Sequence, residues 1–73
     1  MEKRKTIAMV LAFRNFRDRE YFVPKEIFSS AGFLVKTVST EKGTAVGADG
    51  GEVGVDVLLS DLKVTDFDVL VFV

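Results

Sequence analysis

Three apolar segments, separated by polar and glycine-rich stretches, dominate the pattern of this sequence. Residues 6–12 (TIAMVLA) and residues 68–73 (DVLVFV) are almost continuously apolar. Runs of this kind are typical of strands inside a parallel sheet that helices cover on both faces, so residues 68–73 are expected to form a central strand. Residues 33–39 (FLVKTVS) mix apolar and polar positions more, which predicts a strand nearer the edge of the sheet.

A helix is predicted between the first two of these strands, because apolar positions there recur at the spacing of one helical face. The face comprises Ile27, Phe28 and Ala31, with Phe22 or Val23 one turn earlier. Gly32 is a natural stop for this helix, since glycine readily takes the left-handed conformation that follows many helix ends. The strand, the helix and the next strand together predict one right-handed βαβ unit.

The start of the helix has two interpretations. Residues 13–17 are mixed aromatic and basic and are expected to form the loop before it. Asp18 is a suitable N-cap, because its carboxylate can accept hydrogen bonds from the free first-turn amides. Pro24 then either bends a helix that begins near Asp18, or stands at the first position of a separate main helix, where proline is favoured.

A glycine-rich stretch follows the second predicted strand, from Thr40 to Gly54. It matches neither a phosphate-binding loop, which requires G-x-x-x-x-G-K-[ST], nor a dinucleotide fingerprint, which requires G-x-G-x-x-G between a strand and a helix. Residues 44–46 and 52–53 are instead expected to be short extended pieces joined by a turn at residues 48–51, since Asp-Gly is a strong hairpin signal. The stretch therefore predicts a small β-hairpin excursion on the domain surface.

Beyond the hairpin, the chain is expected to form a short strand end after Val55, a turn or short helix over residues 59–64, and a loop over residues 65–68. These elements define an α/β class with a parallel sheet. Seventy-three residues allow at most one small domain, and no repeat, low-complexity tract or linker divides them.

Composition excludes several kinds of site. The sequence has 10 Lys or Arg against 11 Asp or Glu, a net charge of −1, so no global field favours nucleic acid. It has no cysteine and no histidine, which excludes a disulfide, a thiolate nucleophile, a Cys-based metal site and a catalytic imidazole within these residues, and no cofactor is indicated. The apolar runs are far below the roughly 20 residues that span a bilayer. With the cluster Lys3–Lys5 as a solvated lead-in, we expect a cytoplasmic protein that binds neither membrane nor nucleic acid.

One carboxylate stands where it could perform chemistry. Ligands of open α/β sheets bind in the crevice beyond the carboxyl ends of the strands, and Glu20 lies in the first part of the helix that begins there. Asn15, Phe16 and Arg17, in the loop just before it, are candidates for lining the same pocket. The alternative for Glu20 is an exposed acid favoured by the helix dipole, and the alternative for the loop is a solvated surface.

An ordered series of short motifs covers nearly all of the chain. They are Ile7–Leu11, Phe16–Glu20, Val23–Pro24, Ala31–Gly32, Gly47–Gly51, Val55–Asp56 and Asp66–Val73. In this order and spacing, the sequence resembles the N-terminal half of the DJ-1/PfpI (ThiJ) superfamily. The most characteristic pieces are the Glu-x-x-x-Pro spacing from Glu20 to Pro24 and the Phe-Asp-x-Leu run that begins at Phe67.

The resemblance implies a flavodoxin-like parallel sheet with helices on both faces, of which residues 1–73 form the N-terminal half of a single, incomplete domain. In the family, the strand matching residues 68–73 leads into a Gly-Gly loop and then a nucleophilic cysteine on a sharp elbow, often beside a histidine. The glutamate matching Glu20 lies against the cysteine sulfur and supports its acid–base chemistry. A carboxylate beside a thiol has a raised pKa or shares a proton with it, because two adjacent anions are unfavourable.

The predicted function is therefore the N-terminal portion of a cysteine-dependent hydrolase, of the intracellular protease or glyoxalase/deglycase kind, whose nucleophile lies outside this chain. The alternative is a non-enzymatic stress or chaperone-like protein, truncated or oligomeric. A receiver-like domain is disfavoured, because paired acids should follow the first strand and residues 13–15 are Phe, Arg and Asn. A bare strand at residues 68–73 invites pairing, so we expect a homo-oligomer or a complementary C-terminal chain along it.

Overall fold

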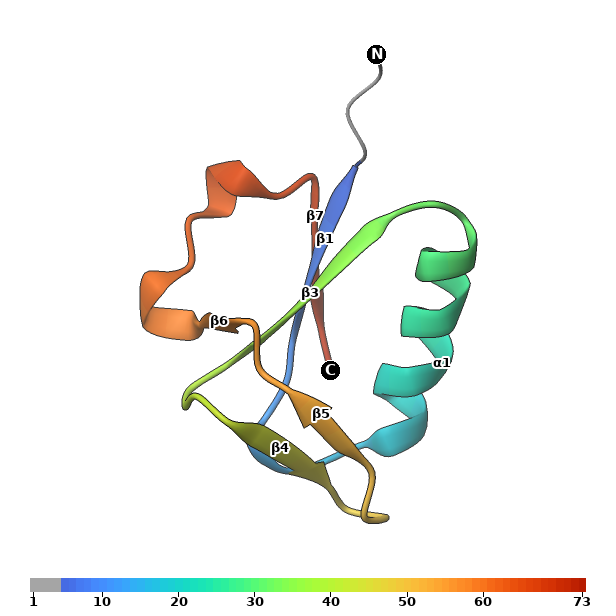
Figure 1. Cartoon of the computed structure of the whole chain (residues 1–73), viewed down its shortest axis with the longest axis vertical. Helices are drawn as coiled ribbons and strands as arrows, with labels where there is room; N and C mark the ends of the chain where they lie inside the picture. The colour runs from blue at the N-terminus through green and yellow to red at the C-terminus, as the bar shows by residue number, and fades with distance from the viewer. Residues whose placement is uncertain (1–4) are drawn as a thin grey trace.

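The computed structural model describes residues 5–73, and its main element is a four-stranded sheet in which every neighbouring pair is parallel (Figure 1). The strand order is β6-β3-β1-β7. The strands are β1 (Thr6–Val10), β3 (Leu34–Ser39), β6 (Val57–Leu58) and β7 (Val69–Phe72). The two most apolar runs of the sequence pair directly, with Ile7 opposite Val69. The predicted α/β class with a parallel sheet is confirmed.

One prediction about the order of the strands is wrong within the described residues. β3 lies inside the sheet rather than near its edge, because the two-residue strand β6 adds outside it. Its buried polar residues are satisfied there: Thr37 contacts the hydroxyl of Tyr21, and the Ser39 hydroxyl donates to the Leu11 carbonyl at 2.8 Å. β7 pairs with β1 alone within residues 5–73, so its other edge is unpaired there; that it is a central strand of a complete sheet stays a prediction.

A second, three-stranded sheet stands at the carboxyl edge of the first (Figure 1). Its strands, in the order β2-β4-β5, are β2 (Arg14–Phe16), β4 (Thr44–Gly47) and β5 (Glu52–Gly54). β4 and β5 form the predicted antiparallel hairpin. The loop predicted over residues 13–17 is instead largely the strand β2. Its backbone pairs with that of β4, where Arg14 lies opposite Val46, and the sequence around residues 13–17 does not reveal this distant partner.

One α-helix, α1 (Asp18–Ser30), lies beside the parallel sheet (Figure 1). It begins at Asp18 and continues through Pro24, so the earlier of the two predicted starts is confirmed. The prediction that Asp18 caps the helix is wrong: Arg17 occupies the N-cap position and makes no side-chain cap bond. The Asp18 carboxylate instead accepts hydrogen bonds from backbone amides of the hairpin. Residues 5–73 contain this single α-helix, so helices on both faces of the sheet stay a prediction.

The end of α1 is a Schellman motif, as its glycine predicts. Gly32 has a φ of +94°, the left-handed conformation that commonly follows a helix. Its amide donates to the Ser29 carbonyl at 3.1 Å, and the Phe33 amide donates to the Phe28 carbonyl at 3.0 Å. The rings of Phe28 and Phe33 meet edge to face with their centroids 6.3 Å apart, which supplies the apolar contact typical of this motif.

The buried face of α1 differs from the predicted face. The side chains that pack in or against the core are Tyr21, Phe22 and Phe28, and those that are exposed are Val23, Ile27 and Ala31. Tyr21 is completely buried, whereas Val23 and Ile27 are 52% and 60% exposed. Tyr21 can be buried because its hydroxyl hydrogen-bonds the hydroxyl of Thr37 beneath the helix. The prediction is therefore right for Phe22 and Phe28 and wrong for Ile27 and Ala31, and hydrophobic spacing alone does not reveal the partner that buries Tyr21.

The connection from β6 to β7 contains two short 3-10 helices, η1 (Leu59–Asp61) and η2 (Val64–Asp66). The first lies within the predicted short helix, and the second extends into the predicted loop at residues 65–68. No helix within the described residues is long and apolar enough to cross a membrane. Of the basic cluster predicted to be a solvated lead-in, Lys5 is exposed, and Lys3 and Arg4 lie outside the described residues.

An aspartate fixes the entry of each short outer strand into the sheet. Asp68, just before β7, accepts from the Thr6 amide at 2.8 Å and donates its own amide to the Thr6 carbonyl at 2.9 Å. Asp56, just before β6, makes the same reciprocal pair with Thr37, with both distances 2.8 Å. The first pair lies at the start of β7 beside β1, and the second lies at the start of β6 beside β3.

Candidate functional site

The junction between β1 and α1 lies at the carboxyl edge of the parallel sheet. β1 and β7 are parallel, so both end at this edge, and the chain passes from β1 through β2 directly into α1. Figure 1 shows the C terminus and the first turn of α1 toward the same end of the sheet. Glu20 lies in that first turn, at the kind of edge where open α/β sheets bind ligands.

The Glu20 carboxylate is exposed and lies beside the guanidinium of Arg17. Its Oε2 atom lies 3.9 Å from Nε of Arg17, and the two side chains are 63% and 81% exposed. An ion pair this long and this exposed contributes little to stability. The carboxylate therefore stays accessible to a ligand or to a group from another polypeptide segment.

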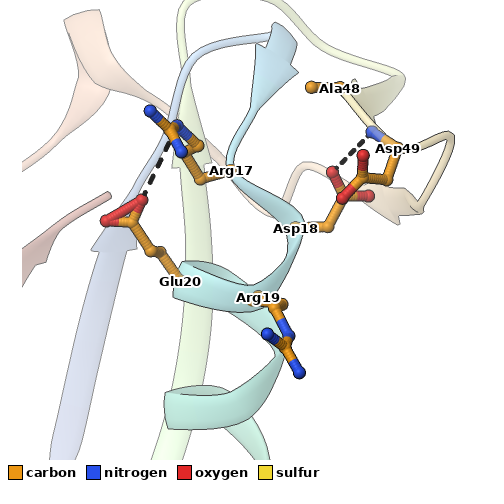
Figure 2. A pocket seen from close by; sticks show the side chains of 6 residues that line it. All are labelled: Arg17, Asp18, Arg19, Glu20, Ala48 and Asp49. Carbon is orange, nitrogen blue, oxygen red and sulfur yellow. Dashed lines mark hydrogen bonds and ion pairs between the residues drawn. The ribbon is translucent and has the colours of Figure 1, made fainter.

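An open depression surrounds this pair, and in Figure 2 the side chains of Arg17 and Glu20 point toward each other. The residues that line it are Arg17, Asp18, Arg19, Glu20, Ala48 and Asp49. Of the predicted pocket residues, only Arg17 lies beside Glu20 in this depression. Phe16 is buried in the core at 3% exposure, and Asn15 is exposed but does not line it. The structure thus brings together two of the four candidates.

Asn15 is nevertheless conformationally unusual. Its φ of 61° is the one left-handed value at a non-glycine position in the described part of the chain, and asparagine tolerates this region better than most residues. The kink coincides with an irregular register between Arg14 and Phe16 opposite β4. It lets the Phe16 ring enter the core while its neighbours Arg14 and Arg17 stay exposed.

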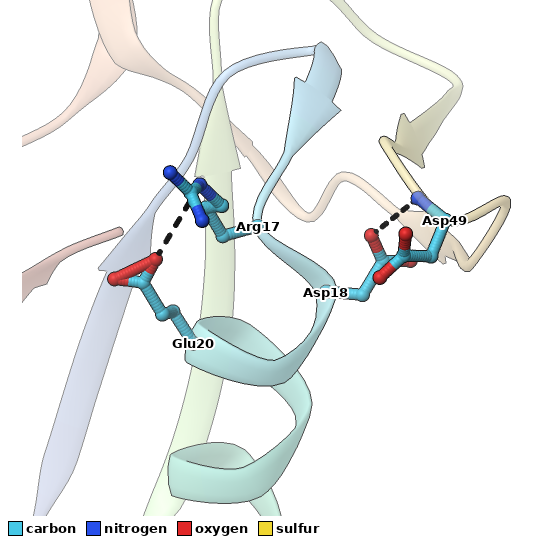
Figure 3. A network of polar contacts seen from close by, with 4 residues as sticks. All are labelled: Arg17, Asp18, Glu20 and Asp49. Atoms are coloured by element: carbon cyan, nitrogen blue, oxygen red, sulfur yellow. Dashed lines mark hydrogen bonds and ion pairs between the residues drawn. The ribbon is translucent and has the colours of Figure 1, made fainter.

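Asp18 joins the start of α1 to the turn of the hairpin (Figure 3). One carboxylate oxygen accepts from the Asp49 amide at 2.8 Å, and the other accepts from the Gly51 amide at 2.7 Å. The bond from Asp49, together with that from Gly51, holds the pKa of Asp18 below its usual range, although desolvation acts in the opposite direction. The ionised Asp18 carboxylate therefore links the start of α1 to the hairpin turn. We call its two hydrogen bonds, to the amides of Asp49 and Gly51, the clasp.

Two glycines leave the space that this carboxylate needs. A Cβ atom at Gly47 or Gly51 would collide with the Asp18 carboxylate, and at Gly51 it would also stand 2.6 Å from the Phe22 ring. The glycine-rich stretch therefore accommodates a carboxylate of the chain itself. Sequence reasoning missed this role. The signal that could have found it is the pair Gly47 and Gly51 at the predicted turn, because a glycine often marks a place where another group approaches the backbone closely.

These residues can place charge and exchange protons, but they supply no nucleophilic thiol or imidazole, since the sequence has neither cysteine nor histidine. Within residues 5–73 no three Asp or Glu side chains are grouped so that they could hold a metal ion. Glu20 can donate or accept a proton, and Arg17 can bind an anionic group beside it. Chemistry at this edge that uses a thiol or an imidazole would need a further group.

Comparison with known sequences identifies the family of this chain. The sequence model of the DJ-1/PfpI family matches residues 5–73. The chain belongs to the DJ-1/PfpI family. The resemblance carried by the Glu20–Pro24 spacing and by the final apolar strand is therefore confirmed.

Individual members of the family agree over almost the whole chain. The crystal structure of a ThiJ/PfpI domain protein from Brachyspira murdochii has a TM-score of 0.91 at 44% identity, covering 97% of this chain and 41% of that chain. An uncharacterised protein of Methanocaldococcus jannaschii is 38% identical over 71 residues, which are 97% of this chain and 35% of that protein. General stress protein 18 of Bacillus subtilis is 40% identical over 68 residues, which are 90% of this chain and 39% of that protein.

The chain therefore spans well under half of the length of these relatives. That it forms the N-terminal half of a single domain stays a prediction. The role of Glu20 likewise stays a prediction, and it depends on groups that this sequence does not contain.

Proposed function

We propose that this chain supplies the glutamate of a cysteine-dependent active site of the DJ-1/PfpI kind, whose nucleophile is carried by residues outside the chain. The reaction would be that of a hydrolase, either of the intracellular protease or of the glyoxalase/deglycase kind. The observation that carries the proposal is the position of Glu20, an exposed carboxylate in the first turn of α1 at the edge where β1 and β7 end. An elbow that follows β7 would emerge at this same edge.

Glu20 would act on the proton of the cysteine thiol. A carboxyl group and a thiol in contact share one proton, because the doubly ionised state is unfavourable. When that proton resides on Glu20, its hydroxyl can donate a hydrogen bond to the thiolate and lower the pKa of the cysteine. Glu20 would thus be a proton partner of the nucleophile, and Arg17, whose Nε lies 3.9 Å from Glu20 Oε2, would bind an anionic part of a substrate.

The first test asks whether the nucleophile exists and where it lies. Mass spectrometry of the intact protein, together with the gene sequence after Val73, should reveal a Gly-Gly loop followed by a cysteine. In a structure of the complete protein, that sulfur should lie within about 5 Å of the Glu20 carboxylate, in hydrogen-bond reach or nearly so. A complete protein with no cysteine at this place would refute the proposal.

The proposed location is the cytoplasm, where the reducing environment keeps a reactive thiol available. The proposed partner is the polypeptide that pairs with the free edge of β7, either a complementary C-terminal segment or further copies of the chain.

A second candidate is a non-enzymatic role in the stress response, which the 40% identity to General stress protein 18 favours. The two candidates differ in their dependence on the thiol. Replacing the cysteine of the complete protein with alanine should abolish turnover of a dicarbonyl or peptide substrate if the protein is an enzyme. A stress role that needs no nucleophile should survive the same replacement, as measured by growth of the producing strain under stress.

A further inference from the structure

We propose that Asp18 is the positioning residue of the Glu20 site: its carboxylate fastens the first turn of α1 to the β4–β5 turn and so sets where the Glu20 carboxylate lies. This inference rests on the proposed function in one respect only, namely that the position of Glu20 matters for a neighbouring thiol. The clasp itself concerns residues of this chain alone.

The geometry of the clasp fixes both position and orientation. Asp18 is the first residue of α1 and Glu20 the third, so their backbones share one helical turn. Both carboxylate oxygens of Asp18 are engaged, by the Asp49 amide at 2.8 Å and by the Gly51 amide at 2.7 Å. Two bonds to two different oxygens prevent the carboxylate from rotating freely, as Figure 3 shows for the side facing Asp49.

The clasp is the last of a series of contacts that hold the hairpin along the β1–α1 junction. The Val46 amide donates to the Phe13 carbonyl at 3.0 Å, and the Ala48 amide donates to the Phe16 carbonyl at 2.9 Å. Asp18 continues this series into the helix itself. The hairpin thus acts as a rigid support for the segment that ends at Glu20.

The start of α1 lacks two contacts that commonly support a first helical turn. Arg17 at the N-cap makes no side-chain bond to the first turn. Pro24 has no N–H, so the Glu20 carbonyl cannot receive the bond that position 24 would donate in a regular helix. The Tyr21 amide does donate to the Arg17 carbonyl at 3.1 Å. The two bonds of Asp18 therefore add a restraint on the first turn that neither an N-cap side chain nor position 24 supplies.

A charged carboxylate suits this role better than an amide of the same shape. Each oxygen of Asp18 faces an N–H donor. An asparagine would place its own NH₂ group against one of these N–H donors. One hydrogen bond would then be lost, and the hydrogen atoms of two donors would face each other. Asp18→Asn therefore changes the clasp with almost no change of volume.

The test compares Asp18→Asn and Gly51→Ala with Asp61→Asn in the complete gene product. Asp61 is an exposed aspartate of η1, so its replacement repeats the chemical change away from the site. Gly51→Ala disturbs the clasp by a collision with the Asp18 carboxylate and leaves every charge in place. Effects shared by the first two variants therefore report on the clasp and not on a lost charge.

Three readouts separate positioning from simple stability. Amide hydrogen exchange at Asp49 and Gly51 should accelerate about 10- to 100-fold, as expected for the loss of a hydrogen bond to a charged group. The NMR titration curve of the Glu20 side-chain carboxyl should change in both clasp variants. The pH profile of thiol alkylation should shift in the direction that Glu20→Gln shifts it. Asp61→Asn should alter none of these.

Each failure has a distinct meaning. If both clasp variants accelerate exchange but leave the Glu20 titration like that of Asp61→Asn, the positioning role is wrong. If Glu20→Gln itself leaves the thiol profile unchanged, the proposed function is wrong, while the Glu20 titration still decides on the clasp. If a clasp variant does not fold, acid titration of the wild type decides: the amide shifts of Arg19 and Glu20 should follow the protonation of Asp18, and independence from it would overturn the proposal.

Discussion

The carboxylate of Asp18 accepts a hydrogen bond from the amide of Gly51 at 2.7 Å, although 33 positions separate the two residues in the chain. This bond connects the first residue of α1 with a turn that belongs to the second sheet. Phe22, one turn farther along α1, approaches the same glycine. The glycine is therefore a packing requirement of the helix and not only a requirement of the turn.

Replacing Gly51 with alanine should destabilise the protein. The new Cβ would collide with the Asp18 carboxylate and stand 2.6 Å from the Phe22 ring, and overpacking of this kind costs about 1–3 kcal/mol. Gly54→Ala is the matched control, because a Cβ at Gly54 meets nothing within 4 Å. Urea unfolding should show a lowered midpoint for Gly51→Ala and a change of less than about 0.5 kcal/mol for Gly54→Ala. Equal midpoints for the two variants would contradict the close approach.

Stability should depend on the ionisation of Asp18 at low pH. Its pKa is lowered in the folded state by the bonds from Asp49 and Gly51, so the folded state holds its proton less tightly than the unfolded chain does. The stabilisation is present above the ordinary aspartate pKa of about 3.9 and is lost as the pH falls through the lower pKa of the folded state. Free energies of unfolding measured between about pH 6 and pH 2 should fall less steeply in Asp18→Asn than in the wild type. A parallel pair of curves would rule out this linkage.

The buried hydroxyls of Tyr21 and Thr37 should behave as a coupled pair. Tyr21→Phe leaves the Thr37 hydroxyl, at 1% exposure, without the partner that it has in the structure. Leaving one buried group unsatisfied costs about 1–3 kcal/mol, whereas replacing both partners with apolar groups is nearly neutral. Tyr21→Phe and Thr37→Val should each lower the free energy of unfolding, and the double variant should recover much of the loss. Additive losses in this double-mutant cycle would show that the two hydroxyls act independently.

The same pair explains which parts of the fold were predictable. Strand runs, the hairpin turn and the Gly32 helix stop are encoded within a few neighbouring residues, and all of them appear where the sequence predicts them. Which side of α1 is buried cannot be predicted from the helix sequence alone. Tyr21 and not Ile27 is buried, and the hydroxyl that Tyr21 meets there belongs to Thr37, 16 positions away. The order of the strands also escapes the sequence pattern, since a two-residue strand such as β6 has no hydrophobic period of its own.

In the candidate site, too, some residues are predictable from the sequence and others are not. Glu20 was found from its place after the first strand and from a family resemblance, and Arg17 from its place in the loop. The clasp at Asp18 was missed, because a single Asp near a helix start predicts a local cap. Its actual partners, Asp49 and Gly51, are 31 and 33 positions away, and only the tertiary structure brings them to the carboxylate.

Under the proposed function, removing the Glu20 carboxyl should raise the pKa of the catalytic thiol in the complete protein. A protonated carboxyl that donates to a thiolate stabilises it by about 1.5–3 kcal/mol, which corresponds to about one to two pKa units. Glu20→Leu removes this donor, and Glu41→Leu, at an exposed position outside the depression, is the matched control. The rate of thiol alkylation as a function of pH measures the shift. A thiol pKa that is the same in both variants would exclude Glu20 as the proton partner.

The free edge of β7 should govern the association of the chain. β7 pairs with β1 on one side only, and Phe72 is 72% exposed on it, so its outer backbone groups and an apolar side chain are open to a further strand. Size-exclusion chromatography with light scattering of the 73-residue chain should therefore show oligomers rather than the 8.1 kDa monomer. Phe72→Lys should weaken this association, because a lysine on an exposed edge strand opposes strand addition. Val64→Lys changes another exposed apolar residue, 60% exposed and away from this edge, and should have little effect. A stable, monodisperse 8.1 kDa monomer would show that β7 needs no partner.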